Sequence, residues 1–127
     1  MNTLSLLNKY SLSAKEVTEF FNKKLLNSIS KDKDTPEEFK QFMLEEGFPL
    51  HRIADIINVQ PRTLFDFFDE HDVIIEIIVY PDKTFSCKIG NQATTNSWKT
   101  RVEAEVFSIE AAFEILEKNL EEKNINN

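Results

Sequence analysis

The chain has 127 residues and a mass of 14.8 kDa, a size that suits one domain or two small subdomains sharing a core. With 41% hydrophobic and 29% charged residues, and only two glycines and four prolines, the composition excludes collagen-like and disordered chains. The formal net charge of −7 arises mainly in residues 61–127, which hold 7 bases and 13 acids, so nucleic-acid binding would require a local concentration of bases.

Two amphipathic helices are predicted in the first 47 residues. The first begins at Ser13, which has the spacing to form a reciprocal cap with Glu16, and runs to about Ile29. After a polar connector, Thr35-Pro36 opens the second helix with a capping residue and a proline suited to the first turn. Gly47 supplies the left-handed residue that ends it.

Two shorter helices follow, joined by a turn of about three residues. One begins at Pro49 and ends at Asn58, a residue that tolerates positive φ. The other is opened by Gln60-Pro61. Their predicted inward-facing residues are Leu50, Ile53, Ala54, Ile57, Leu64, Phe67 and Phe68.

A β-hairpin is predicted after Asp72. Residues 73–80 are rich in β-branched side chains, and Pro81-Asp82-Lys83 is typical of a turn. Residues 84–89 then place Phe85, Cys87 and Ile89 on one face, as a second strand would.

The rest of the chain is predicted to add a third strand and a final helix. Residues 90–97 are polar and loop-like, and residues 98–106 alternate strictly, with Trp98 as a core anchor of the resulting strand. The glutamate and alanine content of this segment leaves a helix as the alternative. Ser108 is expected to cap the last helix, and the tail after Glu122 is expected to fray.

The order of elements indicates an α+β fold, with four N-terminal helices followed by a ββ-β-α unit. We expect residues 1–72 and 73–127 to be subdomains of one compact unit. The C-terminal helix can cover one face of the three-stranded antiparallel sheet. Ile74 and Ile78 leave the other face partly apolar, so that face must pack on the N-terminal helices or on a second copy, giving a homodimer.

Residues 47–72 resemble a helix-turn-helix. This motif needs a small residue where its helices cross, a turn residue with positive φ, an apolar residue after it, and apolar anchors on the second helix. The residues at these positions are Ala54, Asn58, Val59, Leu64 and Phe67.

The same segment resembles the corresponding part of tetracycline-repressor-like regulators. Gly47-Phe48 is similar to their lead-in, and residues 64–68 are similar to the aromatic end of their recognition helix. The resemblance covers about a fifth of the chain and stops at the first strand, because those regulators continue with an all-helical ligand domain.

The resemblance implies a regulatory or accessory DNA-binding protein. Under that hypothesis, Gln60, Arg62 and Thr63 would face base edges, while His51 and Arg52 would approach phosphate. Arg62 is the only cation on the second helix, which weakens the electrostatic case for DNA.

A protein-binding module is the rival hypothesis, docking an acidic surface on a basic partner or acting as a nucleic-acid-mimicking inhibitor from a mobile element. A structural domain that binds only itself is a third. The acidic residues that would carry the second hypothesis are Asp66, Asp69, Glu70, Asp72, Glu103 and Glu105. The local basic residues Lys23, Lys24, Lys31 and Lys33 are more typical of a solvated face than of a phosphate-binding strip.

The sequence gives little support for catalysis. It has no glycine-rich phosphate loop and no serine nucleophile elbow, and His51, His71 and Cys87 lack the close spacing of zinc ligands. We therefore expect no enzyme activity, no metal and no cofactor. No apolar run approaches the ~20 residues of a membrane span, and no secretion signal is evident, so a cytoplasmic protein is expected. The single cysteine, which cannot form an internal disulfide, agrees with that location.

Overall fold

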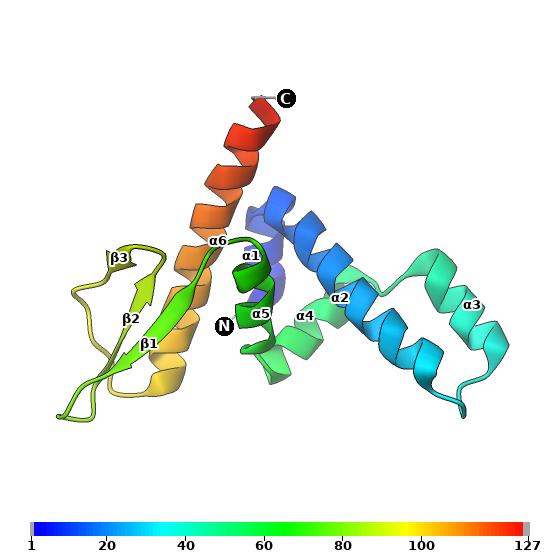
Figure 1. The fold of residues 1–127 in the computed structure, drawn as a ribbon, viewed down its shortest axis with the longest axis horizontal. Coiled ribbons are helices and arrows are strands. Elements are labelled where there is room, and N and C mark those ends of the chain that lie inside the picture. Colours follow the sequence, from blue (N-terminus) through cyan, green and yellow to red (C-terminus); the bar gives the residue numbers. More distant parts are fainter. Residues whose placement is uncertain (1, 126–127) are drawn as a thin grey trace.

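The computed structural model describes residues 2–125 and confirms the predicted α+β class (Figure 1). The N-terminal helices are α1 (Thr3–Lys9), α2 (Ser11–Lys31), α3 (Glu37–Glu46), α4 (Leu50–Val59) and α5 (Thr63–Glu70). The strands β1 (Ile75–Val79), β2 (Phe85–Ile89) and β3 (Gln92–Ala93) form one antiparallel sheet in the order β1-β2-β3. The long helix α6 (Arg101–Ile125) follows them.

Helix α5 joins the two halves of the core through a chain of aromatic rings. Phe20 of α2 meets Phe67 edge-on at 5.6 Å, Phe67 meets Phe68 at 5.2 Å, and Phe68 meets Phe113 of α6 at 5.0 Å between centroids. Phe67, Phe68 and Phe113 are fully buried. Such edge-to-face pairs add ~0.5–1.5 kcal/mol each beyond the burial of their surface. The α5 backbone is therefore held between α2 and α6.

The five N-terminal helices include one, α1, that was not predicted. Asn2 caps it by accepting a hydrogen bond from the Ser5 N–H, and Leu7 is buried. The Thr3 hydroxyl donates to Oδ1 of Asn58, which ties α1 to α4. Helix α2 begins at Ser11, so the predicted start at Ser13 is wrong by two residues.

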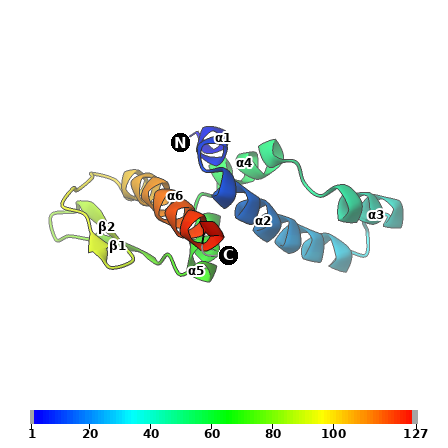
Figure 2. The same cartoon turned by 90° about the horizontal axis from the view of Figure 1, so that it is seen from above.

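The connection from α3 to α4 follows the prediction at Gly47. Its φ of +72° is left-handed, and a Cβ there would lie 3.2 Å from the Asn22 side chain, so glycine is favoured on both grounds. Oδ1 of Asn22 accepts a hydrogen bond from the Phe48 N–H at 2.7 Å. The predicted cap at Thr35 does not form: Pro36 is the residue before α3, no side chain caps the helix, and the Thr35 hydroxyl donates to Asp32. Helix α3 and the end of α2 project from the body on the side opposite the sheet (Figure 2).

The predicted hairpin is confirmed. Ile77 lies opposite Cys87, and Lys83, with a φ of +66°, lies in the tight turn between the strands. Cys87 and Ile89 are buried on the sheet face that α6 covers. Helix α6 lies between the sheet and α2, so it contacts both parts of the chain (Figures 1 and 2).

The prediction for residues 98–106 is wrong. The third strand is Gln92–Ala93, inside the predicted loop, and α6 already begins at Arg101. A reciprocal cap starts this helix: the Thr100 hydroxyl donates to Glu103 at 3.0 Å and accepts from the Glu103 N–H at 3.2 Å. Trp98, which lies outside the named strands, makes an isolated bridge with Phe85 at the start of β2.

The predicted cap at Ser108 is also wrong. Ser108 is buried within α6 and donates to the Glu105 carbonyl oxygen at 2.7 Å. Ala104, Ser108 and Ala112 recur at four-residue spacing as the small buried residues of the helix, whereas Val102 is 64% exposed. The helix continues to Ile125 without the fraying expected after Glu122, and residues 126–127 lie outside the described part.

Candidate binding surface

The helix pair α4–α5 departs from a helix-turn-helix at its turn. Asn58 was predicted to adopt positive φ, but it is helical, and only Asp72 and Lys83 among the described non-glycine residues have positive φ. Its side chain holds α1 instead. Val59, which the motif would bury, is 79% exposed. Two of the five motif positions therefore play other roles here, while Ala54, Leu64 and Phe67 are buried as the motif requires.

The five residues predicted to contact DNA lie at opposite ends of α4. His51 and Arg52 are exposed in its first turn, and Gln60, Arg62 and Thr63 surround its junction with α5. Arg52 and Gln60 are eight positions apart, which corresponds to about 12 Å at the α-helical rise. The Thr63 hydroxyl donates to the Gln60 carbonyl oxygen at 2.7 Å, so it is used within the turn.

Arg62 is held by a buried carboxylate. Its Nε and Nη2 lie 3.0 and 2.9 Å from Oε1 of Glu105 on α6, and the Glu105 side chain is only 7% exposed. A carboxylate removed from water needs a compensating cation and hydrogen bonds. Arg62 supplies both, and its charge is therefore largely compensated within the protein.

The acidic residues predicted for partner binding divide into two groups. Glu103 and Glu105 fall in the segment predicted to be a strand, but they lie on α6, where Glu103 caps the helix and Glu105 is buried. On α5, Asp66, Asp69 and Glu70 occupy positions i, i+3 and i+4 and are all exposed. We call these three residues, with the exposed Asp72 that follows at a φ of +62°, the acidic face.

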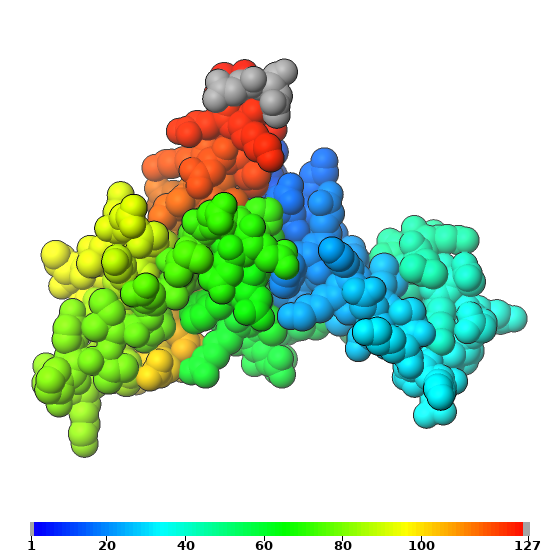
Figure 3. Space-filling model, in the orientation of Figure 1, coloured from blue at the N-terminus to red at the C-terminus, as the bar shows by residue number. Residues whose placement is uncertain are grey.

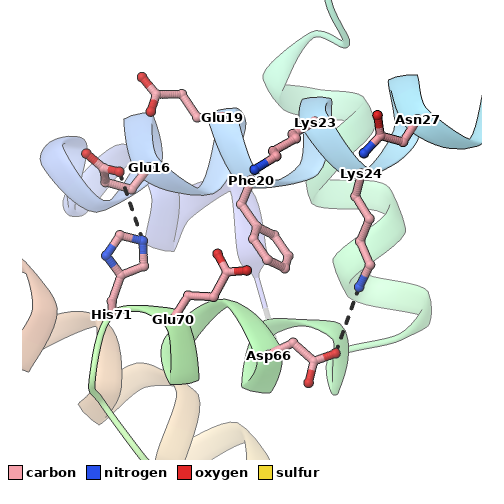
Figure 4. Close-up of a pocket in the computed structure, with 9 residues that line it drawn as sticks. All are labelled: Glu16, Glu19, Phe20, Lys23, Lys24, Asn27, Asp66, Glu70 and His71. Carbon is pink, nitrogen blue, oxygen red and sulfur yellow. Dashed lines mark ion pairs between the residues drawn. The ribbon is translucent and has the colours of Figure 1, made fainter.

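The acidic face borders a groove of about 590 Å³ between α2 and α5 (Figure 4). Its lining residues are Glu16, Glu19, Phe20, Lys23, Lys24, Asn27, Asp66, Glu70 and His71. Two ion pairs span the helices: His71 Nε2 lies 4.0 Å from Glu16, and the Lys24 ammonium lies 3.8 Å from Asp66. Figure 4 shows these pairs at opposite ends of the groove, with the ring of Phe20 between them.

The groove is polarised along its length. Glu19 and Glu70 lie toward the His71 end, whereas Lys23, Lys24 and Asn27 lie toward the other (Figure 4). Within residues 2–125, Glu19, Glu70 and Lys23 form no ion pair within 4.0 Å. These charges are available to a bound partner.

Sequence reasoning missed the α2 wall of this groove. Glu16, Glu19, Phe20, Lys23 and Asn27 recur at spacings of three and four residues and so share one helix face. Lys23 and Lys24 lie near Lys31 and Lys33 in sequence, but only Lys23 and Lys24 line the groove. A helical projection of α2 would have found the wall, but not its apposition to α5.

The described residues offer little for metal or redox chemistry. No group of three or more His, Cys, Asp or Glu side chains within residues 2–125 is arranged to hold a metal ion. Cys87 is buried in the sheet, and this burial raises the pKa of its thiol. Within the same range, every helix is too short or too polar to cross a lipid bilayer.

No protein-family model, curated protein or solved structure matches the chain. The groove and the acidic face are therefore the features of the structure that bear on function.

Proposed function

We propose that this chain is a non-enzymatic protein-binding module that receives a basic segment of a partner protein in the groove between α2 and α5. The observation that carries the proposal is the pairing of Arg62 with buried Glu105. This ion pair engages Arg62, which is the one cation at the start of α5. The helix itself, Thr63–Glu70, contains no lysine or arginine. The surface offered by this helix is therefore acidic.

The same observation argues against DNA reading by α5. A recognition helix enters the major groove with its exposed side chains toward bases and phosphates. Here those side chains include Asp66, Asp69 and Glu70, which phosphates repel. Arg62 is 67% exposed and keeps N–H donors that do not contact Glu105, but its charge is already paired, so it would add little attraction for phosphate.

The groove has the chemistry to bind a positively charged peptide with one apolar side chain. Glu19 and Glu70 would pair with lysine or arginine, and the half-buried ring of Phe20 would contact the apolar residue. Charge complementarity of this kind speeds association and makes it sensitive to salt. A cytoplasmic location is part of the proposal and agrees with the single, buried thiol of Cys87.

The test is a calorimetric titration with two probes: a peptide library of lysine, arginine and leucine in mixed order, and random-sequence duplex DNA, both at low salt. We expect the peptides to bind in a salt-sensitive manner and the DNA not to bind. The double variant Glu19→Lys, Glu70→Lys should lose about tenfold or more in affinity, because it places cations on both walls of the groove.

The matched control is Glu45→Lys, Glu46→Lys. It makes the same change in net charge at two exposed positions on α3, outside the groove. An equal loss in both variants would show that only net charge matters. Salt-sensitive binding of the duplex without peptide binding would overturn the proposal in favour of a DNA-binding helix-turn-helix.

A further inference from the structure

The strand β1 is an edge of the sheet, and the backbone polar groups of three of its five residues have no partner among residues 2–125. Gly90 donates to the Ile74 carbonyl oxygen and Tyr80 donates to that of Thr84, so the even-numbered residues of this segment direct their backbone groups toward β2. Successive residues of a strand alternate. The N–H and C=O groups of Ile75, Ile77 and Val79 therefore point away from β2.

This edge is accessible and apolar. The strand order places β2 between β1 and β3, and Figure 3 shows the hairpin at the molecular surface, at the end opposite α3. Ile74 and Val79 are 44% and 54% exposed. An open edge of β-branched residues is a template for pairing with another strand.

We infer that two copies of this chain pair through their β1 edges, antiparallel about a twofold axis at Ile77. In this register Ile77 lies opposite Ile77 of the second copy, and Ile75 of each copy lies opposite Val79 of the other. All of these residues carry outward-pointing backbone groups, and each opposed pair can exchange two hydrogen bonds. The interface is self-complementary, as a twofold dimer requires.

The side chains favour this register over its neighbours. Centring the axis on Ile77 sets Glu76 opposite Ile78 of the second copy, which avoids a carboxylate facing a carboxylate. Centring it on Glu76 would set the two Glu76 side chains directly opposite, which is destabilising. Centring it on Ile78 would set Ile75 opposite Pro81, beyond the end of the strand.

The dimer has one continuous sheet with both α6 helices on the same face, because a twofold axis normal to the sheet preserves its faces. Within each copy, Glu76 retains Lys88 of β2 as its cross-strand neighbour. The pairing uses the β1 edge and leaves the groove between α2 and α5 outside the interface, so it stands independently of the proposed function.

The test is sedimentation velocity of the full chain across a range of concentrations, with two variants at one position. Val79→Pro removes an outward N–H without removing a bond between β1 and β2, and proline is tolerated on the free side of an edge strand. By symmetry it removes two hydrogen bonds from the dimer. We expect a dimer for the native chain, at least about tenfold weaker dimerisation for Val79→Pro, and an unchanged dimer for Val79→Thr, which keeps the donor.

Amide hydrogen exchange of the native chain provides a second readout that needs no variant. The amides of Ile75, Ile77 and Val79 should exchange more slowly as the protein concentration rises. A chain that remains monomeric at all concentrations, with fast exchange at these three amides, would overturn the inference. A dimer that leaves these amides unprotected would overturn it equally, because its interface would lie elsewhere.

Discussion

The carboxylate of Glu117, on α6, accepts hydrogen bonds from both the N–H and the hydroxyl of Ser13, at 2.8 and 2.9 Å. It also accepts the Leu12 N–H at 3.2 Å. The first N–H groups of a helix have no partner within it, and the positive end of the helix dipole favours an anion there. Glu117, which is 104 positions from Ser13 in sequence, therefore caps the N-terminus of α2 in place of a local residue.

We expect Glu117→Ala to lower the free energy of unfolding by about 1–2 kcal/mol, because it removes this cap. Urea denaturation followed by circular dichroism measures the change. Glu114→Ala is the matched control: Glu114 lies on an exposed face of the same helix and, within residues 2–125, pairs only with Lys118, so its loss should cost less than about 0.5 kcal/mol. Equal effects of the two substitutions would contradict the capping role.

This contact also shows where sequence reasoning about the fold reaches its limit. Ser13 and Glu16 have the spacing of a local cap, and no pattern within α2 indicates that Glu117 takes the role instead. The hairpin was predictable because its signals, a β-branched run and Pro81-Asp82, are local.

The start of α6 was predictable in principle. Thr100 and Glu103 carry the spacing of a reciprocal cap, but residues 98–106 also alternate as a strand would. Alternation over nine residues and a helical stripe share several positions, so pattern alone does not separate them when alanine and glutamate are frequent.

A double-mutant cycle on Arg62 and Glu105 tests whether Arg62 is structural. Arg62→Ala should lower the free energy of unfolding by about 1–3 kcal/mol, because it leaves a buried carboxylate without its partner. Arg62→Ala combined with Glu105→Ala should cost less than the sum of the single substitutions. The control Arg52→Ala, at an exposed position on α4, should change stability by no more than about 0.5 kcal/mol. Additive effects in the cycle would show that the ion pair contributes nothing.

Of the candidate site, the exposed acidic residues of α5 could be predicted from the local sequence, whereas the pairing of Arg62 could not. The exposure of Asp66, Asp69 and Glu70 follows from the helical period of α5, since Leu64 and Phe67 fix its buried side. The partner of Arg62 is 43 residues away, on a segment predicted to be a strand, so its neutralisation could not be foreseen.

Cys87 should react slowly with thiol reagents in the native protein. Its side chain is fully buried and burial raises its pKa, so little thiolate forms and little of it is accessible. We expect labelling by a disulfide reagent at pH 8 to be at least about a hundredfold slower in buffer than in 8 M urea. Rapid stoichiometric labelling without denaturant would show that this part of the sheet opens readily.

The burial of Cys87 also determines the direction in which the stability of the native protein changes with pH. A thiol whose pKa is higher in the folded state keeps its proton there while the unfolded chain loses it. The stability of the native protein should therefore fall as the pH rises above the ordinary pKa of cysteine. Cys87→Ala should remove this contribution to the alkaline slope, which urea titrations between pH 8 and 10 would reveal. An identical slope in the variant would contradict the assignment.

The turn between β1 and β2 holds a carboxylate whose ionisation is coupled to the hairpin. Oδ1 of Asp82 accepts the Thr84 hydroxyl at 2.6 Å and the Thr84 N–H at 3.1 Å, and these bonds lower the pKa of Asp82, the hydroxyl more than the N–H. Because the folded pKa is lowered, the stabilisation is present above the ordinary pKa of an aspartate and is lost as the pH falls through the folded value. Thr84→Val should raise the pKa of Asp82 toward its ordinary value while leaving the backbone bond.

Side-chain carboxyl chemical shifts followed by NMR between pH 2 and 6 measure this change. Asp32 is an internal control, because its pKa is lowered by its own bonds, to the Asp34 N–H at 3.0 Å and the Thr35 hydroxyl at 2.9 Å, which lie far from the hairpin in sequence. The Asp32 titration should not move in Thr84→Val. A shift of both aspartates by the same amount would mean that the substitution acts through general loosening of the fold. A shift of Asp82 alone would establish that the Thr84 hydroxyl sets the protonation of the turn.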